Sequence, residues 1–508
     1  MASVAPAQAA PGGGALHRVR SWGPHARAAL QRNWLFAIFV LLGIGLRAAA
    51  SVAYWPALEL HADSYDYLSL AHSLTPGVWH PSGYPLLLAL LSLARSIGLV
   101  VILQHLMGIA MGVIVYALTL RLGARRWLAA LAALPVLLDA YQVDLEQYVL
   151  AETLTDLLLL GGMAALLWLK DVGAKRAAAA GLLLAAAALT RTATLPVLAV
   201  AVLYLLVPRP RWRPLLSCCA AAAVLLVGYG GWYAANYGYF GYSDYTGVWL
   251  YGRVAPFATC HYSLSHEEAK LCPSQPVGKR SVNPEFWADS RDSPIHSLQL
   301  ANGRQRNSLG QRFAIAVIEH QPLAYAGAVL ADTWHYFTPG RWQNADHVDM
   351  TRWIFPPPHF HTYGHGYHVT FANTGFNNAR IEAKPNAALM GPLRTYQSIF
   401  YTPGPLLLVC LIGALVIALG LARKRTGRRH ARWAALVLAV SAVLVILSSS
   451  LFAQFSYRYG LPLLVLLPPA GAVAADIGLD AIRARRRITS PGGLSAHAEQ
   501  RGAAEPVH

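Results

Sequence analysis

The sequence predicts an all-α, polytopic membrane protein, from its composition, its repeated apolar runs and the placement of its basic residues. Hydrophobic residues make up 55% of the 508 residues and charged residues only 13%, which is far from the profile of a soluble domain. The apolar runs recur at about the 20-residue length that a helix needs to cross a bilayer. The glycine patterns of Rossmann and phosphate-loop domains are absent from the sequence, so no nucleotide-binding domain is expected.

Ten apolar runs are predicted to form membrane-spanning helices. They are Trp34–Tyr54, Val100–Leu120, Trp127–Tyr141, Val149–Leu169, Ala177–Leu189, Ala193–Val207, Leu215–Ala235, Thr402–Ala422, Trp433–Leu451 and Leu461–Ile482. Lys and Arg cluster in alternate loops between these runs, and such clusters mark the cytoplasmic side of inner-membrane proteins. The alternation supports the count of ten and predicts a multi-pass protein of the bacterial inner (plasma) membrane.

Charge placement divides the chain into five parts. Residues 1–33 are predicted to form a basic cytosolic tail, without the apolar core of a cleavable signal peptide. Residues 34–235 and 402–482 hold the membrane helices, residues 236–401 form a large extracytoplasmic loop or subdomain, and residues 483–508 form a disordered cytosolic tail. The net charge of +17 comes mainly from the loop clusters, so the lipid bilayer is an expected partner and nucleic acid is not.

Two of the segments that are predicted to lie outside the membrane are long. The first, 55–98, is polar and aromatic and contains Leu86–Leu93, an apolar run that is too short to cross the bilayer and is expected to lie along its surface. The second, 236–401, contains Cys260 and Cys272. These cysteines can pair in an oxidising compartment, but their spacing alone leaves the disulfide open.

Two aspartates near the start of the first external segment are the leading candidates for chemistry. Asp63 and Asp66 follow the first membrane run closely and lie among aromatic residues that favour the membrane interface. Charged groups at a membrane are functional candidates by default, whereas either aspartate alone is also compatible with an ordinary solvated loop charge. A carboxylate at this place can act as a general base on an acceptor hydroxyl.

The motif around these aspartates resembles that of a known family. Its residues are Asp63-Ser64-Tyr65-Asp66-Tyr67 and His80-Pro81-Ser82-Gly83-Tyr84-Pro85. A first external loop of this kind resembles the GT-C superfamily of polyprenyl-phosphate-sugar glycosyltransferases, which includes the aminoarabinose transferases and the protein O-mannosyltransferases. The resemblance implies a GT-C-type bundle of about ten transmembrane helices with an external mixed loop domain, and a catalytic loop within 55–98. It implies Asp63 as the catalytic base and Asp66 as its companion. His80 stands where the aminoarabinose transferases have a lysine that contacts the donor phosphate.

The resemblance continues at three later positions. Glu152 lies in an ETL element, Arg191 in an LTR element and Arg458 in an RYxxP element at the start of the last run. The resemblance implies that Glu152 is a further catalytic carboxylate. It implies that Arg191 and Arg458 hold the donor phosphate, which a guanidinium binds bidentately. The residues expected to line the acceptor and donor pocket are Tyr67, Tyr84 and Tyr459.

The activity that the resemblance implies is inverting transfer of a hexosyl or pentosyl group from a polyprenyl-phosphate-linked sugar. The acceptor is an extracytoplasmic lipid, glycan, wall polymer or protein.

A polytopic transporter or lipid flippase is the alternative, because Arg47, Asp139 and Asp156 fall within or beside apolar runs and buried charges also mark transport pathways. A divalent metal, Mg²⁺ or Mn²⁺, stays open as a cofactor. The His-rich stretch 359–368 is either a metal site or an aromatic polar loop at the membrane surface.

Overall fold

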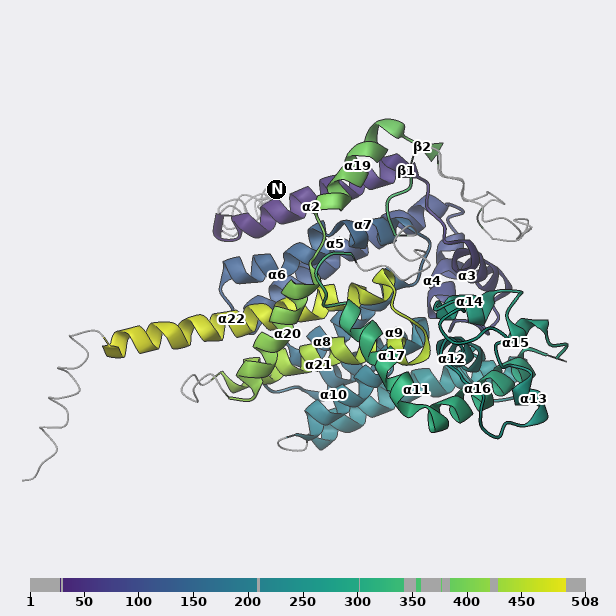
Figure 1. Ribbon diagram of the computed structural model, residues 1–508. Helices are drawn as coiled ribbons and strands as arrows, with labels where there is room; N and C mark the ends of the chain where they lie inside the picture. Colours follow the sequence, from purple (N-terminus) through teal and green to yellow (C-terminus); the bar gives the residue numbers. More distant parts are fainter. Residues whose placement is uncertain are drawn as a thin grey trace, which may run out of the picture.

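The secondary structure of the protein is almost entirely helical. The computed structural model describes residues 28, 31–207, 211–300, 302–341, 353–357, 376, 384–420 and 428–489, with the backbone alone at 61–62 and 484–489. Two short strands, β1 (Tyr54–Trp55) and β2 (Lys384–Pro385), pair antiparallel. Figure 1 shows this pair at one edge of a stack of long helices. The prediction of an all-α protein is confirmed.

Each of the ten predicted apolar runs contains a helix. The helices are α2 (Trp34–Ala53), α5 (Ile97–Arg121), α6 (Arg126–Leu138), α8 (Glu152–Leu167), α9 (Ala174–Thr190), α10 (Pro196–Leu206), α11 (Trp212–Tyr237), α20 (Gly404–Ala418), α21 (Arg429–Phe452) and α22 (Leu461–Thr489). Within the described ranges, five helices are long and apolar enough to cross a membrane alone, and up to eight spans result if each of three bent helix pairs counts as one. The protein is therefore a multi-pass membrane protein by helix length and composition, while the count of ten spans stays a prediction.

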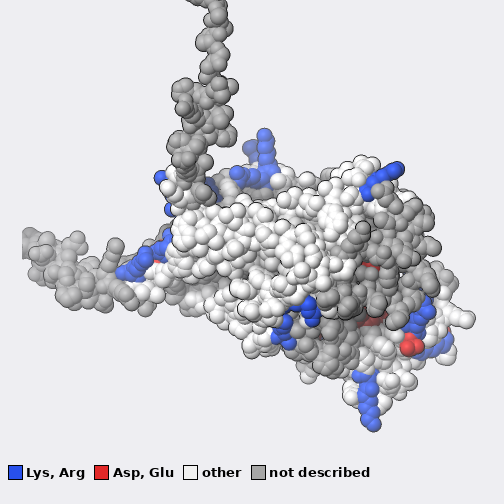
Figure 2. Space-filling view, turned by 90° about the horizontal axis from the view of Figure 1, so that it is seen from above, with Lys and Arg blue, Asp and Glu red and all other residues white. Residues whose placement is uncertain are grey.

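Large apolar side chains point outward from the long helices. Leu41 of α2, Val224 of α11 and Val409 of α20 are 68%, 74% and 65% exposed. Figure 2 shows a broad area without charged side chains, with Lys and Arg nearer its edges. Exposed apolar area of this kind marks a surface that is covered by another apolar phase, which for helices of this length is the lipid of the bilayer.

The third apolar run is interrupted at Asp139, near its end, and the helix that follows Asp139 extends beyond the run. Helix α6 ends directly before Asp139 and α7 (Ala140–Gln147) begins directly after it, at an angle of 43°. Asp139 Oδ1 accepts hydrogen bonds from the N–H groups of Tyr141 (2.9 Å) and Gln142 (3.3 Å), so the side chain caps α7. Its Oδ2 accepts from the N–H of Thr402 at 2.6 Å. Through this hydrogen bond, Asp139 links the junction of α6 and α7 to the residues directly before α20.

The first external segment, 55–98, is largely helical rather than an open loop. Helix α3 (His61–Ser73) forms from the polar part of the segment, and α4 (Gly83–Ser92) covers most of the short apolar run. The polar composition of α3 gives little sign of a helix, but Tyr67 and Leu68 are only 1% exposed. Burial against neighbouring helices therefore stabilises α3, as tertiary packing commonly does for weak helix sequences.

The second external segment, 236–401, divides between two hydrophobic cores. Five of its helices are α12 (Thr246–Val254), α13 (His266–Ala269), α14 (Pro284–Asp289), α15 (Pro294–Ser297) and α16 (Gly303–His320), and they are called the helical subdomain below. They surround a core of their own, lie at one end of the stack near α3 (Figure 1), and carry the disulfide between Cys260 and Cys272. By contrast, α19 (Ala387–Ile399) packs into the core of the membrane helices. The disulfide that the spacing left open is thus formed.

A buried ion pair joins several of the membrane helices. Arg47 of α2 donates through Nε and Nη2 to the two carboxylate oxygens of Glu146 in α7, at 2.7 Å each. His105 of α5 contacts the same carboxylate at 2.9 Å, and Arg47 also donates to the carbonyls of Val136 and Leu137 in α6. Buried charges are tolerated when they are paired and fully hydrogen-bonded. This cluster therefore fixes how α2, α5, α6 and α7 pack together.

Removal of one charge from this pair is expected to destabilise the protein more than removal of both. Arg47→Met leaves Glu146 buried without its cation and should lower the free energy of unfolding by about 3 kcal/mol. The double variant Arg47→Met/Glu146→Gln removes the unpaired charge and should recover part of that loss. Thermal unfolding of the purified variants in detergent compares them, and a double variant less stable than Arg47→Met would contradict the role assigned to the pair.

Candidate active site

Four charged residues from distant parts of the chain meet at the ends of helices. Asp63 lies in the first turn of α3 and Glu152 is the first residue of α8, where the helix dipole favours a carboxylate. Arg191 follows the last residue of α9. Arg458 lies in the short 3-10 helix η4 (Tyr457–Gly460), directly before α22. The structure brings together these four residues, which the sequence predicted for one site.

The four charges form one continuous chain of contacts. Asp63 pairs with Arg458. Nη1 of Arg458 lies 3.6 Å from Oε1 of Glu152, and Glu152 in turn pairs with Arg191. The four side chains are between 3% and 20% exposed, so each charge is largely removed from water but has an opposite charge beside it. Alternation of sign explains why a cluster this buried is tolerated, since a lone buried charge would be strongly destabilising.

Both guanidinium groups share one aromatic neighbour. The guanidinium carbons of Arg191 and Arg458 lie 4.7 Å and 4.9 Å from the ring centroid of Tyr459, within the range of cation–π interactions. Nη2 of Arg458 also donates to the Tyr459 hydroxyl at 3.0 Å. The ring holds two cations close together, and this concentrates positive charge on one side of the site.

His80 lies on the acidic side of the site. Its Nε2 is 3.6 Å from Oδ1 of Asp63, and its ring centroid is 5.2 Å from that of Tyr67. The approach of this segment to the end of α9 depends on Gly83, because a Cβ there would lie 2.6 Å from the carbonyl oxygen of Leu189. A larger residue at position 83 would push α4 away from the end of α9, which is followed by Arg191.

The three predicted pocket tyrosines have different surroundings. Tyr67 and Tyr459 contact charged or titratable groups of the site. Tyr84 is fully buried, packs edge-on against Tyr67 at 5.2 Å, and donates its hydroxyl hydrogen to Gln104 Oε1 at 2.7 Å. Its polar atom is therefore directed at α5, and Tyr84 supports Tyr67 rather than facing the ion pairs.

The two aspartates of α3 have opposite pKa shifts. Burial acts to raise the pKa of Asp63, but the charge of Arg458 and the contact with His80 outweigh it and hold the pKa well below its usual range. Burial raises the pKa of Asp66 to about 6, against the lowering effect of His80 and with a further raising contribution from Asp63. Among the described residues Asp66 Oδ2 has no hydrogen-bond partner. At neutral pH, Asp63 is a firmly ionised partner of an arginine, and Asp66 is the carboxyl that is ready to exchange a proton.

The helical subdomain adds an acidic residue that the sequence did not single out. Asp289, the last residue of α14, has its pKa raised to about 7, chiefly by burial and by the charge of Glu285, with a smaller contribution from Asp63. Its Oδ1 accepts a hydrogen bond from the Tyr245 hydroxyl at 3.2 Å, and the Tyr245 ring lies 5.0 Å from that of Trp79, the neighbour of the site histidine. No local motif surrounds Asp289, so the sequence offered no signal for it.

The structure bears on two other predicted roles. The described part of the chain contains no group of three or more His, Cys, Asp or Glu side chains suited to a metal ion, and the His-rich stretch 359–368 lies outside it. Two of the three charges that suggested a transporter have fixed structural partners, since Asp139 caps α7 and Arg47 is held by Glu146. The third, Asp156, lines a small cavity beside the ion-pair chain and so belongs to the site.

Asp66 is expected to make stability depend on pH. Because its pKa in the folded protein, about 6, is above the ordinary value of 3.8, its favourable contribution is fully present below about pH 4 and is lost as the pH rises through 6. The free energy of unfolding should therefore rise in Asp66→Asn relative to wild type across this window, by on the order of 2 kcal/mol. Thermal unfolding at matched pH values measures the difference, with Asp292→Asn, an exposed aspartate of the helical subdomain, as control. A difference that stays constant from pH 4 to 7 would contradict the raised pKa.

Comparisons with known proteins give one structural similarity. No protein-family model and no curated protein matches the sequence. Among solved structures, the protein is similar to the archaeal oligosaccharyltransferase AglB from Archaeoglobus fulgidus, which was solved in complex with an inhibitory peptide and a dolichol-phosphate. The sequence identity is 12%, the TM-score is 0.42, and the similarity covers 90% of this chain and 52% of AglB. The chain thus spans about half the length of AglB, and a TM-score of 0.42 is too low to establish a shared fold.

Proposed function

We propose that the protein is a membrane glycosyltransferase that moves a sugar from a polyprenyl-phosphate donor to an extracytoplasmic acceptor, which is a lipid, glycan, wall polymer or protein. The observation that supports this most directly is the placement of Arg191 and Arg458 around one tyrosine ring, beside the carboxylate of Asp63. A pair of cations suits a phosphate leaving group, and a neighbouring carboxylate suits a hydroxyl nucleophile. Both needs are met within one partly buried cluster at the ends of membrane helices.

The proposed side of the membrane follows from the charges at the other ends of these helices. Helix α8 begins at Glu152 and is followed by Lys170, while α9 carries Lys175 and Arg176 in its first turn and ends before Arg191. The basic residues that mark cytoplasmic loops therefore lie at the ends away from the site. This supports a site on the extracytoplasmic face of the bacterial inner membrane.

The donor phosphate is proposed to replace carboxylates that occupy the arginines in the free protein. Arg458 is now paired with Asp63, and Arg191 with Glu152. A phosphate ester offers the same guanidinium groups more acceptor oxygens and a bidentate geometry. Its binding to Arg458 releases Asp63, whose pKa then returns toward its usual range because the cation that lowered it is neutralised. Donor binding thereby converts Asp63 from a weak base into a stronger one.

The released carboxylate then completes the transfer. Asp63 takes the proton of the acceptor hydroxyl, and the oxygen forms a bond to the anomeric carbon of the sugar from the face opposite the phosphate. The bond between the anomeric carbon and the phosphate oxygen breaks, and its electron pair leaves on the polyprenyl phosphate, where Arg191 and Arg458 stabilise the charge. Inversion at the anomeric carbon follows from this geometry. Glu152 and Asp66 position the acceptor. His80 lies beside Asp63 rather than beside the two arginines, so its contact with the phosphate stays a prediction.

Asp63→Asn separates the two roles assigned to this residue. Loss of the base should lower sugar transfer by at least about 100-fold, whereas donor phosphate should bind more tightly because Asp63 no longer competes for Arg458. The measurements are sugar transfer in reconstituted vesicles and binding of radiolabelled polyprenyl phosphate. The variant should remain folded, because Glu152 still lies beside Arg458 and balances its charge. Thermal unfolding checks this.

The matched variants make the test specific. Arg191→Gln should weaken polyprenyl-phosphate binding roughly tenfold, because it removes charge-assisted hydrogen bonds. Asp292→Asn, outside the site, should leave transfer and binding unchanged. A wild-type protein that transfers no sugar from any polyprenyl-phosphate donor would overturn the proposed function. An Asp63→Asn variant with full transfer would remove Asp63 as the base.

A further inference from the structure

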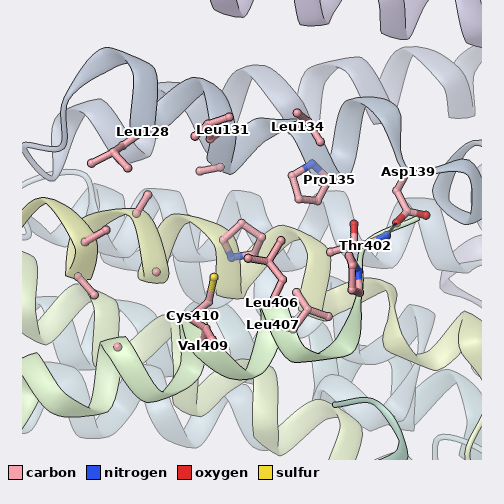
Figure 3. Close-up of a pocket in the computed structure, with 18 of the residues that line it drawn as sticks. Leu128, Leu131, Leu134, Pro135, Asp139, Thr402, Leu406, Leu407, Val409 and Cys410 are labelled. Carbon is pink, nitrogen blue, oxygen red and sulfur yellow. Dashed lines mark hydrogen bonds between the residues drawn. The ribbon is translucent and has the colours of Figure 1, made fainter. Parts of the chain in front are cut away.

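A long apolar groove lies apart from the ion-pair chain. Helices α6 and α20 both pack against α22 and leave a cavity of about 630 Å³ between them. Figure 3 shows Leu128, Leu131 and Leu134 of α6 facing Leu406 and Val409 of α20 across this space. The groove is open to the outside of the bundle, since Leu131, Leu406 and Val409 are 45%, 50% and 65% exposed. Its walls suit a hydrocarbon chain that enters sideways from the bilayer.

The groove has polar groups at one end. There Asp139 and Thr402 are joined by their hydrogen bond, and Tyr401 lines both the groove and a smaller cavity beyond it. The guanidinium carbon of Arg341 lies 4.9 Å from the ring centroid of Tyr401 and 5.6 Å from that of Tyr141.

Among the residues that the structure describes, Arg341 pairs with no carboxylate at this end of the groove. Its Nη2 donates to the backbone carbonyl of Gln397, and within the described ranges no acidic side chain forms an ion pair with it. A half-buried cation held by aromatic rings and a neutral carbonyl retains N–H donors for an anion.

We infer that this groove binds one acyl chain of an anionic phospholipid from the surrounding bilayer, with the lipid phosphate at Arg341. The length supports an acyl chain, because the groove follows α6 from Leu128 to Asp139, about 17 Å at the helical rise per residue. That is close to one leaflet, about half of the hydrocarbon thickness of a bilayer. Arg341 at one end of the groove matches the phosphate of a lipid at the membrane surface, and the open side leaves the second acyl chain in the bilayer.

The groove is separate from the proposed donor site. Helix η4 lies between them: Tyr457 and Gly460 line the cavity that continues the groove, whereas Arg458 and Tyr459 line the cavity beside Arg191. A phosphate at Arg341 therefore lies on the other face of η4 from the two site arginines. The inference does not depend on the proposed function, because it concerns lipid binding in the absence of any sugar donor.

Lipid binding to the delipidated full-length protein in detergent tests the inference. Native mass spectrometry would follow titration with phosphatidylglycerol, and with phosphatidylcholine of the same acyl chains. Wild type should bind one phosphatidylglycerol before other lipids. Arg341→Gln should reduce phosphatidylglycerol affinity roughly tenfold, towards that of phosphatidylcholine, because it removes the charge that selects the head group. Val409→Trp should reduce binding of both lipids, because it fills the groove.

Two matched substitutions control for general effects of charge and size. Arg304→Gln removes an arginine that also lies over a tyrosine ring, that of Tyr239. Val224→Trp enlarges a valine on α11 that is also largely exposed. Neither should change lipid binding. Equal affinity of wild type for the two phospholipids would overturn the head-group site, and equal binding by Val409→Trp and Val224→Trp would overturn the groove. If the groove variants lost polyprenyl-phosphate binding and kept phosphatidylglycerol, the occupant would be the donor chain and the inference would be wrong.

Discussion

The site depends on the need to balance four charges at the ends of apolar helices. Water reaches little of the four side chains of Asp63, Glu152, Arg191 and Arg458. Each charge is therefore stable only beside a charge of opposite sign. Their alternation draws together the starts of α3 and α8, the end of α9 and the 3-10 turn before α22. The arrangement of these helix ends, and with it the shape of the site, follows from this electrostatic constraint as much as from apolar packing.

The Arg47–Glu146 pair satisfies the same constraint in a different way. Its guanidinium has hydrogen bonds to three carbonyls as well as to the carboxylate. A Cβ on the nearby Gly108 would lie only 2.0 Å from Glu146 Oε1, which leaves no space for a ligand. Near the ion-pair chain of the site, by contrast, Glu152 and Asp156 each retain a buried oxygen without a partner in the described structure, and a small cavity adjoins them. Saturated partners and close packing indicate a structural pair, whereas unsatisfied atoms beside open space indicate a place where a ligand can bind.

The sequence predicted much of the helical content and the convergence of the charged residues. Apolar runs locate membrane helices because the bilayer imposes one length and one polarity on them, and the sidedness of Lys and Arg puts Asp63, Arg191 and Arg458 on one face. The helical state of α3 was not predictable, because burial of side chains such as Tyr67 and Leu68 stabilises it and local propensity does not. The contribution of Asp289 was not predictable either, since it depends on how the helical subdomain packs against the segment between α3 and α4, a long-range contact without a motif.

The helical subdomain forms hydrogen bonds with two segments that lie next to site residues. On one side, the N–H of Asp244 donates to the carbonyl of Val78 at 2.8 Å, two residues before His80. On the other side, Glu285 accepts a hydrogen bond from Gln454 at 3.3 Å, in the segment that leads into η4. Under the proposed function, phosphate occupies the arginine side of the site, so an acceptor must approach from the acidic side, where the subdomain adds Asp289. The choice of acceptor therefore falls to a part of the chain that takes no part in holding the donor, which allows acceptor specificity to change without loss of the phosphate site.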